Sequence, residues 1–358
     1  MNSSNLNYPQ IVFGDKILGR KQCVQCSSTF WHVDPAMKYC GSEECNLNFN
    51  RCTLPKSNTS LKDTLSQFVN FFKSNPISAH NKVHAMRRAK TASKYSSTNM
   101  FFICAGCSAF ESMLNENYPE RVNTFSRDLF INTQFCYRFL DKKNVGVTGR
   151  HSTGFFMSGL HCFESVQDKF PLDWQDQWAT HLIRYFSEEL KINLNQIYIH
   201  ADYWSDSIRG GPSIEFFVNG IEVGNMVFTI KRTDLQQELK NRYLDVGLGI
   251  ERIHNIVSEN SLDYFKTPLR DHLRSLLIGF ADMLYPSKIG LGYNLRKLVE
   301  TILRDHTRDL AQLRGHIEQI TQELRIVLEE DTFNEKLVQI AINIMSQELK
   351  RCIQSNII

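Results

Sequence analysis

The sequence predicts an α+β fold in which a mixed antiparallel sheet carries flanking helices, between a cysteine-rich N-terminal segment and a helical C-terminal region. Three observations support this class. Four cysteines stand in two close pairs between residues 23 and 45, six strand-like runs lie between residues 100 and 232, and helical periodicity prevails beyond residue 255. Strands that follow one another with few intervening helices, and helices gathered at one end, are typical of α+β proteins.

Composition narrows the class of protein. The 358 residues are 42% hydrophobic and 22% charged, with a net charge of only +3, so a globular protein is expected and a nucleic-acid partner is neither required nor excluded. Because we find no N-terminal leader pattern and no apolar run of about 18 residues, we expect a cytoplasmic protein without a membrane partner. Cysteines in a reducing compartment more often hold a metal than form disulfides.

The N-terminal cysteines have the spacing of a zinc site. Cys23-x2-Cys26 is followed after thirteen residues by Cys40-x4-Cys45, and two such turns can complete a tetrahedral thiolate site. Glycine after Cys40 suits the required turn. Four free buried cysteines are the alternative, and Cys52 and His32 stand near as replacement ligands. A second pair, Cys104 and Cys107, lies in an apolar run and is interpreted as buried small side chains.

Helices and boundaries follow from periodicity and capping signals. Residues 57–75 read as a capped helix with apolar side chains three and four residues apart, residues 73–99 as a loop, and residues 174–192 as a helix between strands. Beyond residue 255 the helical runs are 269–284, 293–306 and 337–352. We therefore predict an N-terminal zinc-binding segment at 1–55, a central domain at 56–255 and a helical region at 256–358.

Two segments carry residues suited to phosphate chemistry. In CYRFLDKKNVGVTGRHSTGFF an arginine ends one strand, a polar loop follows, and a second strand begins near Arg150 and His151. In LDVGLGIERI a glycine-rich turn is expected to lead into a helix near Glu251. Helix N-termini and arginine side chains both favour anions. Taken alone, an arginine such as Arg138 at a sheet edge is more often a solvated charge, and a phenylalanine such as Phe155 in an apolar strand is usually a core residue.

Taken together, these segments resemble the class II aminoacyl-tRNA synthetases, specifically the archaeal type of alanyl-tRNA synthetase. NVGVTGRH at 144–151 is similar to the family's second motif and DVGLGIER at 245–252 to its third. The resemblance extends to the paired cysteines with FWHVDP between them, to GGPSIEF and EVGNMVF, and to DHLRSLLIGFADMLYPS and GYNLRKL. It therefore covers nearly the whole chain and implies the class II synthetase fold.

The resemblance implies a role for individual residues. It places Arg138 on the α-phosphate of ATP and Arg252 on the far phosphates, both as catalytic groups, and it places Asp245 on the α-ammonium group of the amino acid. Phe155 is expected to stack on adenine. The remaining expected ATP-binding residues are Arg150, His151, Glu215, Glu222 and Gly249, with the two glutamates holding Mg²⁺ or ribose, and the remaining amino-acid-binding residues are Gly247 and Trp204.

The implied function is ATP-dependent activation of alanine, or of another small amino acid, to an aminoacyl-adenylate. The acceptor stays open between tRNA, a carrier protein, a protein side chain and a small metabolite. A non-catalytic paralogue that binds nucleotide, amino acid or RNA as a sensor or partner subunit is the alternative. Family members continue through further tRNA-recognition and editing domains, so a truncated stand-alone paralogue is expected. A homodimer is left open, because the dimerising first motif is only loosely matched over residues 61–110.

The chain also departs from the family pattern. The family's strand glutamate is replaced by Phe156, the aromatic before Phe155 by Gly154, and a Met-Gln pair by Thr229 and Ile230. Losing a carboxylate and an amide removes two potential polar contacts. We therefore expect nucleotide or acceptor handling to differ from that of the family, with weak or absent activity as one consequence.

Overall fold

The computed structural model describes residues 8, 10–13, 16–42, 44–45, 54, 56–75, 82–94, 100–110, 127–165, 174–205, 209–232 and 237–357. The chain forms two compact units that interleave along the sequence. Unit 1 comprises Met1–Arg87, Phe110–Gln134 and Met157–Asn260, and unit 2 comprises Arg88–Ala109, Phe135–Phe156 and Ser261–Ile358. Cys52 lies outside the described residues. The division of the sequence into segments 1–55, 56–255 and 256–358 stays a prediction.

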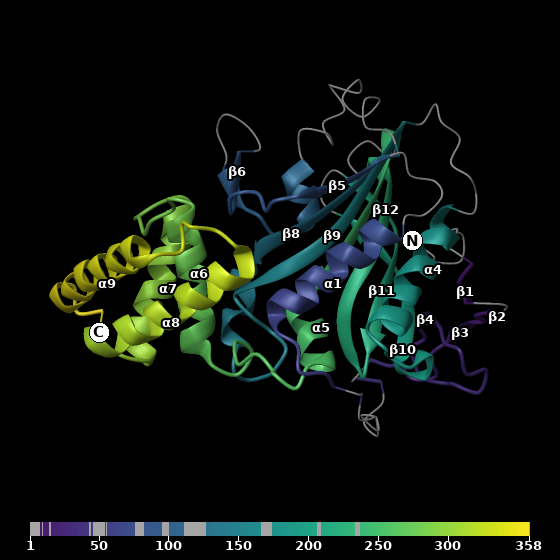
Figure 1. The fold of residues 1–358 in the computed structure, drawn as a ribbon, viewed down its shortest axis with the longest axis horizontal. Coiled ribbons are helices and arrows are strands. Elements are labelled where there is room, and N and C mark those ends of the chain that lie inside the picture. The colour runs from purple at the N-terminus through teal and green to yellow at the C-terminus, as the bar shows by residue number, and fades with distance from the viewer. Residues whose placement is uncertain are drawn as a thin grey trace. The chain divides into compact units, whose positions relative to one another are not determined.

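A nine-stranded mixed sheet confirms the predicted α+β class (Figure 1). From β3 to β9, in the sheet order given next, neighbouring strands are antiparallel, whereas β5 and β8 run parallel. In sheet order the strands are β3 (Arg20–Gln22), β4 (Thr29–Trp31), β10 (Ile197–Ser205), β11 (Arg209–Val218), β12 (Ile221–Arg232), β13 (Gln237–Gly249), β9 (Gly154–Ser165), β8 (Leu129–Tyr137) and β5 (Val83–Met86).

Two small hairpin-like sheets accompany the large one. The first joins β1 (Val12–Phe13) to β2 (Lys16–Ile17), and the second joins β6 (Ala92–Lys94) to β7 (Met100–Phe102). Strands β5 and β6 both fall within residues 73–99, where we expected only a loop. That expectation was wrong because β5 (VHAM) and β6 (ASK) are only four and three residues long, which is too short for an alternating pattern to be recognised.

Among the residues of unit 1 that the structure describes, the α-helices are α1 (Leu61–Ser74), α4 (Trp174–Arg184) and α5 (Ile250–Val257). Helix α1 confirms the helix predicted over residues 57–75. It begins with a capping box, in which the Ser60 hydroxyl accepts from the Asp63 N–H and the Asp63 carboxylate accepts from the Ser60 N–H. Phe68 of α1 packs edge-on against Tyr185, in the π-helical turn Tyr185–Glu189 that continues α4. Both helices lie on the same side of the sheet in Figure 1.

Unit 2 is built around helix α6 (Pro268–Ala281), whose residues 271–280 are all buried. It is packed by α7 (Leu291–Asp305), α8 (Leu310–Leu328) and α9 (Glu335–Gln354), and α8 also packs on α9 (Figure 1). A helix buried all round is the centre of its bundle. Among the described residues, no helix has the length and apolar character that crossing a membrane would require.

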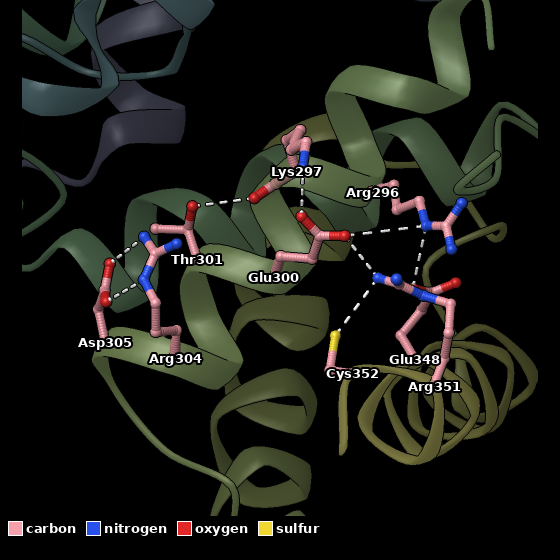
Figure 2. A network of polar contacts seen from close by, with 9 residues as sticks. All are labelled: Arg296, Lys297, Glu300, Thr301, Arg304, Asp305, Glu348, Arg351 and Cys352. Carbon is pink, nitrogen blue, oxygen red and sulfur yellow. Dashed lines mark hydrogen bonds and ion pairs between the residues drawn. The ribbon is translucent and has the colours of Figure 1, made fainter. Parts of the chain in front are cut away.

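A network of ion pairs joins α7 to α9 within this bundle (Figure 2). Glu300 of α7 accepts hydrogen bonds from Lys297 at 2.8 Å and from Arg351 of α9 at 2.5 Å. Arg351 also donates to Glu348 at 2.5 Å. Burial acts to raise the pKa of Glu300, but its bonds to Lys297 and Arg351 outweigh that effect and lower it. The carboxylate is therefore held ionised between two helices.

Candidate active-site residues and metal centre

The four predicted cysteines come together in unit 1. Their sulfur atoms all lie within 4.8 Å of one another, and Cys26 Sγ is 3.8 Å from Cys40 Sγ. Zinc–sulfur bonds of about 2.3 Å in a tetrahedron require sulfur–sulfur distances of about 3.8 Å. The four sulfur atoms are therefore placed so that they could hold one metal ion.

The chemistry of these thiols also fits a cation. Burial raises the pKa of Cys40, and it raises that of Cys45 to about 11. Burial acts in the same direction on Cys23, but hydrogen bonds from the backbone of Cys26, Gln25 and Cys40 outweigh it and lower the pKa of Cys23 to about 6. Grouped thiols resist losing their protons together, and a metal ion reverses that resistance by supplying positive charge.

The residues around the cluster explain its geometry. Gly41 has φ +82°, and a Cβ there would lie 2.2 Å from the ring of Tyr198, so the predicted need for glycine after Cys40 is confirmed. His32 is not a replacement ligand, because its Nδ1 accepts from the Asp34 N–H and its Nε2 lies 3.1 Å from the Asn195 carbonyl. In unit 2, Cys104 is exposed and Cys107 is buried in a 3₁₀ turn, so the interpretation of both as buried side chains holds only for Cys107.

Four of the predicted ATP-binding residues lie in unit 2, on the connection between β8 and β9. Arg138 is exposed directly after β8, and its guanidinium carbon lies 5.9 Å from the ring centre of half-buried Phe155 on β9. In the loop between them, His151 Nδ1 is 2.7 Å from the Thr148 hydroxyl, whose oxygen also accepts from the Arg150 N–H at 3.4 Å. The loop therefore gathers two arginines, a histidine and an accessible aromatic ring.

Helix α6 fixes the start of β9 below this loop. Asp271 is fully buried and accepts from the Thr153 N–H with both carboxylate oxygens, at 3.1 and 3.0 Å. Arg274 donates to the Gly154 carbonyl and lies over the ring of Tyr264 at 3.9 Å. Burial raises the pKa of Asp271 to about 6, although Arg274 and the Thr153 bonds act against the rise. This pair positions the backbone immediately before Phe155.

Asp245 lies in unit 1, on β13 opposite His161 of β9. Asp245 Oδ1 is 3.1 Å from His161 Nδ1, and His161 Nε2 is 3.0 Å from Asn132 Oδ1 on β8. The Asp245 side chain keeps 17% of its exposure, whereas His161 keeps 1%. The partly accessible Asp245 carboxylate therefore lies at the end of a row of buried polar side chains, His161 and Asn132, that we did not predict.

The glycines of this segment occupy a strand rather than the turn that we predicted. Gly247 and Gly249 both belong to β13, and α5 begins directly afterwards at Ile250, close to the predicted position. The segment is extended because it pairs with β9 as far as Gly249 and with β12 as far as Leu248. A Cβ at Gly247 would lie 2.8 Å from Met157 Sδ, while at Gly249 it would meet only ordinary contacts. Trp204 is half-buried on β10, opposite Gly211.

The predicted acidic residues and Arg252 also lie in unit 1. Arg252 of α5 donates to the Glu222 carbonyl at 2.9 Å, and the same nitrogen lies 3.5 Å from the Glu222 carboxylate. Burial, with added repulsion from Glu222 and Asp202, raises the pKa of Glu215 to about 7. Oxygen donors with mutual repulsion fit a divalent cation, which would lower that pKa.

The residues that depart from the family pattern lie in the packed core. Phe156 is 1% exposed and packs on Phe135 at 5.1 Å between ring centres, so an apolar contact stands where the family has a carboxylate. Gly154 leaves no room for a side chain, because a Cβ would lie 2.5 Å from the Phe135 ring. Thr229 is fully buried on β12, and its hydroxyl has no hydrogen-bond partner among the described residues.

Sequence reasoning missed four buried polar residues beside these groups, namely His161, Asn132, Asp271 and Arg274. Each had a detectable signal, since a polar side chain inside an otherwise apolar strand or helix needs a partner. Asn132 and His161 interrupt apolar strands, and Asp271 and Arg274 share one face of an apolar helix. Their partners could not be inferred, because the pairing depends on strand register and helix packing.

Comparison with known proteins agrees with these motifs. A family model described as class II (A) tRNA synthetases matches residues 64–220. The alanine–tRNA ligase of Nitrosopumilus maritimus is 25% identical over 354 residues, which cover 79% of this chain and 38% of that protein. The alanine–tRNA ligase of Thermofilum pendens is 29% identical over 247 residues, which cover 66% of this chain and 25% of that protein. The chain thus spans between 25% and 38% of the length of these two ligases.

Among solved structures, a pyrrolysyl-tRNA synthetase from Desulfitobacterium hafniense is matched over 58% of this chain and 76% of that chain, with 12% identity and a TM-score of 0.38. The family model, the two alanine–tRNA ligases and the two signature segments agree with one another. Residues 64–220 of this chain thus match the class II (A) tRNA synthetase family model, and the chain is similar in sequence to alanine–tRNA ligases.

Proposed function

We propose that the chain catalyses ATP-dependent activation of alanine, or of another small amino acid, to an aminoacyl-adenylate. The observation that carries the proposal is the placement of the two signature segments. NVGVTGRH connects β8 to β9 with Arg138 exposed beside Phe155, and DVGLGIER runs from β13 into α5 with Asp245 partly accessible. Arg138, which precedes the first segment, and Asp245, in the second, therefore both keep side-chain surface that a ligand can reach.

In this reaction a carboxylate oxygen of the amino acid attacks the α-phosphorus of ATP, the bond to the bridging oxygen breaks, and pyrophosphate leaves. Arg138 is proposed to stabilise the charge that develops on the α-phosphate, and Arg150 and His151 to contact the triphosphate. Phe155 would stack on adenine. The step needs no general base, because positioning and charge stabilisation carry it.

The residues of unit 1 have complementary proposed roles. Asp245 would bind the substrate ammonium group, with Gly247 and Trp204 beside it, and Arg252 would bind the far phosphates, with Gly249 leaving room. Magnesium bound with ATP would supply further positive charge, and Glu215 and Glu222 are the carboxylates proposed to hold it or the ribose.

Zinc is the metal that we propose for the cysteine cluster. Four thiolates in a closed tetrahedral arrangement are typical of structural zinc. The sulfur spacing at Cys26 and Cys40 supports this assignment. The ion would stabilise the segment that contains β3 and β4, which is too small to hold a core of its own.

The acceptor of the activated amino acid is a separate question. Transfer to tRNA and transfer to a carrier protein, a protein side chain or a small metabolite are the proposals, and supplying each acceptor to the purified protein discriminates between them. A homodimer also remains a proposal, to be tested by sedimentation.

A non-catalytic role is the competing candidate, and one observation favours it. Phe156 replaces the carboxylate of the second motif with a core side chain. A sensor or partner subunit that binds nucleotide, amino acid or RNA would tolerate this loss. The retention of Arg138, Asp245 and Arg252 argues for the enzyme, because a site under no catalytic constraint would be expected to lose its phosphate arginines.

Amino-acid-dependent exchange between ATP and pyrophosphate tests the proposal. The zinc-replete protein should exchange with alanine, and Arg138→Ala should reduce the rate by about 100-fold or more, as expected when one transition-state donor is removed. Arg325→Ala, which alters an arginine 53% exposed on α8, is the matched control and should retain the native rate. Absence of exchange with any amino acid, despite measurable ATP binding, would refute the enzyme and favour the non-catalytic alternative.

A further inference from the structure

We propose that His161 is the positioning residue for Asp245, and that its Nδ1–H group holds the carboxylate in the orientation that receives the substrate ammonium. This inference rests on the proposed function, in which Asp245 binds the amino acid. It adds a residue that neither signature segment contains.

The first support is the fixed orientation of the imidazole ring. His161 stands directly opposite Asp245 in the register of β9 and β13, with Nδ1 3.1 Å from Oδ1. Its other nitrogen lies 3.0 Å from Asn132 Oδ1, and its ring packs on Phe110 with 4.5 Å between ring centres. With 1% of the side chain exposed, the ring has no room to turn away.

The second support is a chain of buried polar atoms in which one change of amide orientation pairs Asn132 and directs the ring proton of His161 toward Asp245. Asp245 Oδ1, His161 Nδ1 and Asn132 Nδ2 are buried without a hydrogen-bond partner of good geometry among the described residues. Amide oxygen and nitrogen positions are assigned from the hydrogen-bond network. Turning the Asn132 amide over lets Nδ2 donate to His161 Nε2, which leaves the ring proton on Nδ1 facing Asp245. Asn132 Nδ2 is then paired, and the Nδ1 proton lies on the side of the ring that faces Asp245 Oδ1 at 3.1 Å.

The third support is that the space for this contact depends on glycine. Gly159 stands opposite Gly247, and a Cβ on Gly159 would lie 2.4 Å from His161 Nε2 and 2.7 Å from Asn132 Oδ1. A side chain there would push the ring off Asp245. The strand is therefore built so that the histidine and the asparagine can meet.

The chemistry also favours a neutral donor at this position. A neutral imidazole N–H orients one carboxylate oxygen without cancelling the negative charge. The other oxygen is left to accept from the substrate ammonium. A lysine or arginine in place of His161 would compete with that ammonium for the same charge.

Two substitutions separate the two contacts of the ring. In His161→Asn the amide lies about where Nδ1 was, so a donor to Asp245 is kept. In His161→Gln it lies about where Nε2 was, so the contact to Asn132 is kept and the donor to Asp245 is lost. We expect His161→Gln to raise the KM for alanine in pyrophosphate exchange by about 10-fold or more, since a hydrogen bond to a charged group is lost, with the KM for ATP unchanged. His161→Asn should show a smaller rise.

Equal rises in the KM for alanine and for ATP, or a His161→Gln value within about 2-fold of the native one, would overturn the inference. A native protein that shows no exchange would refute the proposed function instead. In that case nitrogen NMR of histidine-labelled native protein still decides the contact. A proton on Nδ1 of His161 is the expected result, and an unprotonated Nδ1 overturns the inference whatever the activity.

Discussion

Replacing Arg351 by methionine would test the ion-pair network that joins α7 to α9 (Figure 2). Methionine keeps the unbranched stem of the side chain and removes the guanidinium. The change deletes the 2.5 Å contacts to Glu300 and Glu348, whose side chains are only 7% and 16% exposed. It therefore leaves two largely buried carboxylates with fewer partners.

The loss of stability in Arg351→Met can be estimated from the ion pairs that the two glutamates keep. Breaking a fully buried ion pair costs about 3 to 5 kcal/mol. Here Glu300 keeps Lys297 at 2.8 Å, Glu348 keeps Arg296 at 3.4 Å, and Arg351 is itself 25% exposed. We therefore expect a loss of about 2 kcal/mol in the free energy of unfolding at pH 7, within the range for hydrogen bonds to charged groups.

The stability difference between the native protein and Arg351→Met should also depend on pH in a definite direction. The folded-state pKa of Glu300 is lowered, so this contact stabilises the protein fully above the unfolded-state pKa of about 4.5 and loses its effect as pH falls through the folded value. The difference between native protein and Arg351→Met should thus be full at pH 7 and shrink below about pH 4.5. Above pH 5 it should be nearly constant.

Urea unfolding followed by far-ultraviolet circular dichroism measures this difference. Arg304→Met is the matched control, because Arg304 pairs with Asp305 on the same helix while 53% exposed. An exposed pair of this kind should contribute about 0.5 kcal/mol or less. The reasoning would be refuted if the two variants lost equal stability at pH 7, or if the loss in Arg351→Met did not change between pH 7 and pH 3.

Three further predictions concern the cysteine cluster and the carboxyl group of Glu215. Cys45→Ser should lower bound zinc from one ion per chain to well below one, measured by atomic absorption after dialysis, whereas an unchanged ratio would contradict the four-cysteine site. Gly41→Ala should destabilise the protein by about 1 to 3 kcal/mol in thermal unfolding, because the Cβ collides with Tyr198 at a positive φ. Glu215 keeps its proton to about pH 7 when folded but loses it near pH 4.5 when unfolded, so stability falls as pH rises between these values. Glu215→Gln should remove that part of the slope, and an unchanged slope would contradict the raised pKa.

Much of the fold could be predicted because its elements carry strong local patterns. Helix α1 has both a capping box and an apolar face, and the predicted strands of the sheet contain long runs of aromatic and β-branched residues. Strands β5 and β6 escaped detection because they are only four and three residues long. The parallel pairing of β5 with β8 was also beyond reach, since it depends on a contact between residues 83–86 and 129–132.

The sequence motifs of the candidate site could be predicted, but the buried residues that contact them could not. Arg138, Asp245 and Arg252 lie in or beside recognisable motifs, and the spacing of the four cysteines predicts a metal site. The pairing of Asp245 with His161 depends on strand register, and the bond from Thr153 to Asp271 depends on how α6 packs. Sequence periodicity carries no information about either distance. Chemistry that lies within one segment could thus be inferred, and chemistry that joins two segments could not.

The fit between Gly154 and Phe135 constrains how this protein can change over time. A ring from β8 fills the volume above a glycine of the neighbouring strand β9, and a Cβ on that glycine would come within 2.5 Å of the ring. A lineage acquiring one substitution at a time could not place a bulky residue at position 154 before position 135 had become smaller. We therefore expect the residue tolerated at position 154 to depend on the side chain at position 135, with steric collision setting the order of change. Comparing position 154 alone with the family pattern would register a lost aromatic residue, although the Phe135 ring keeps the space between the two strands filled.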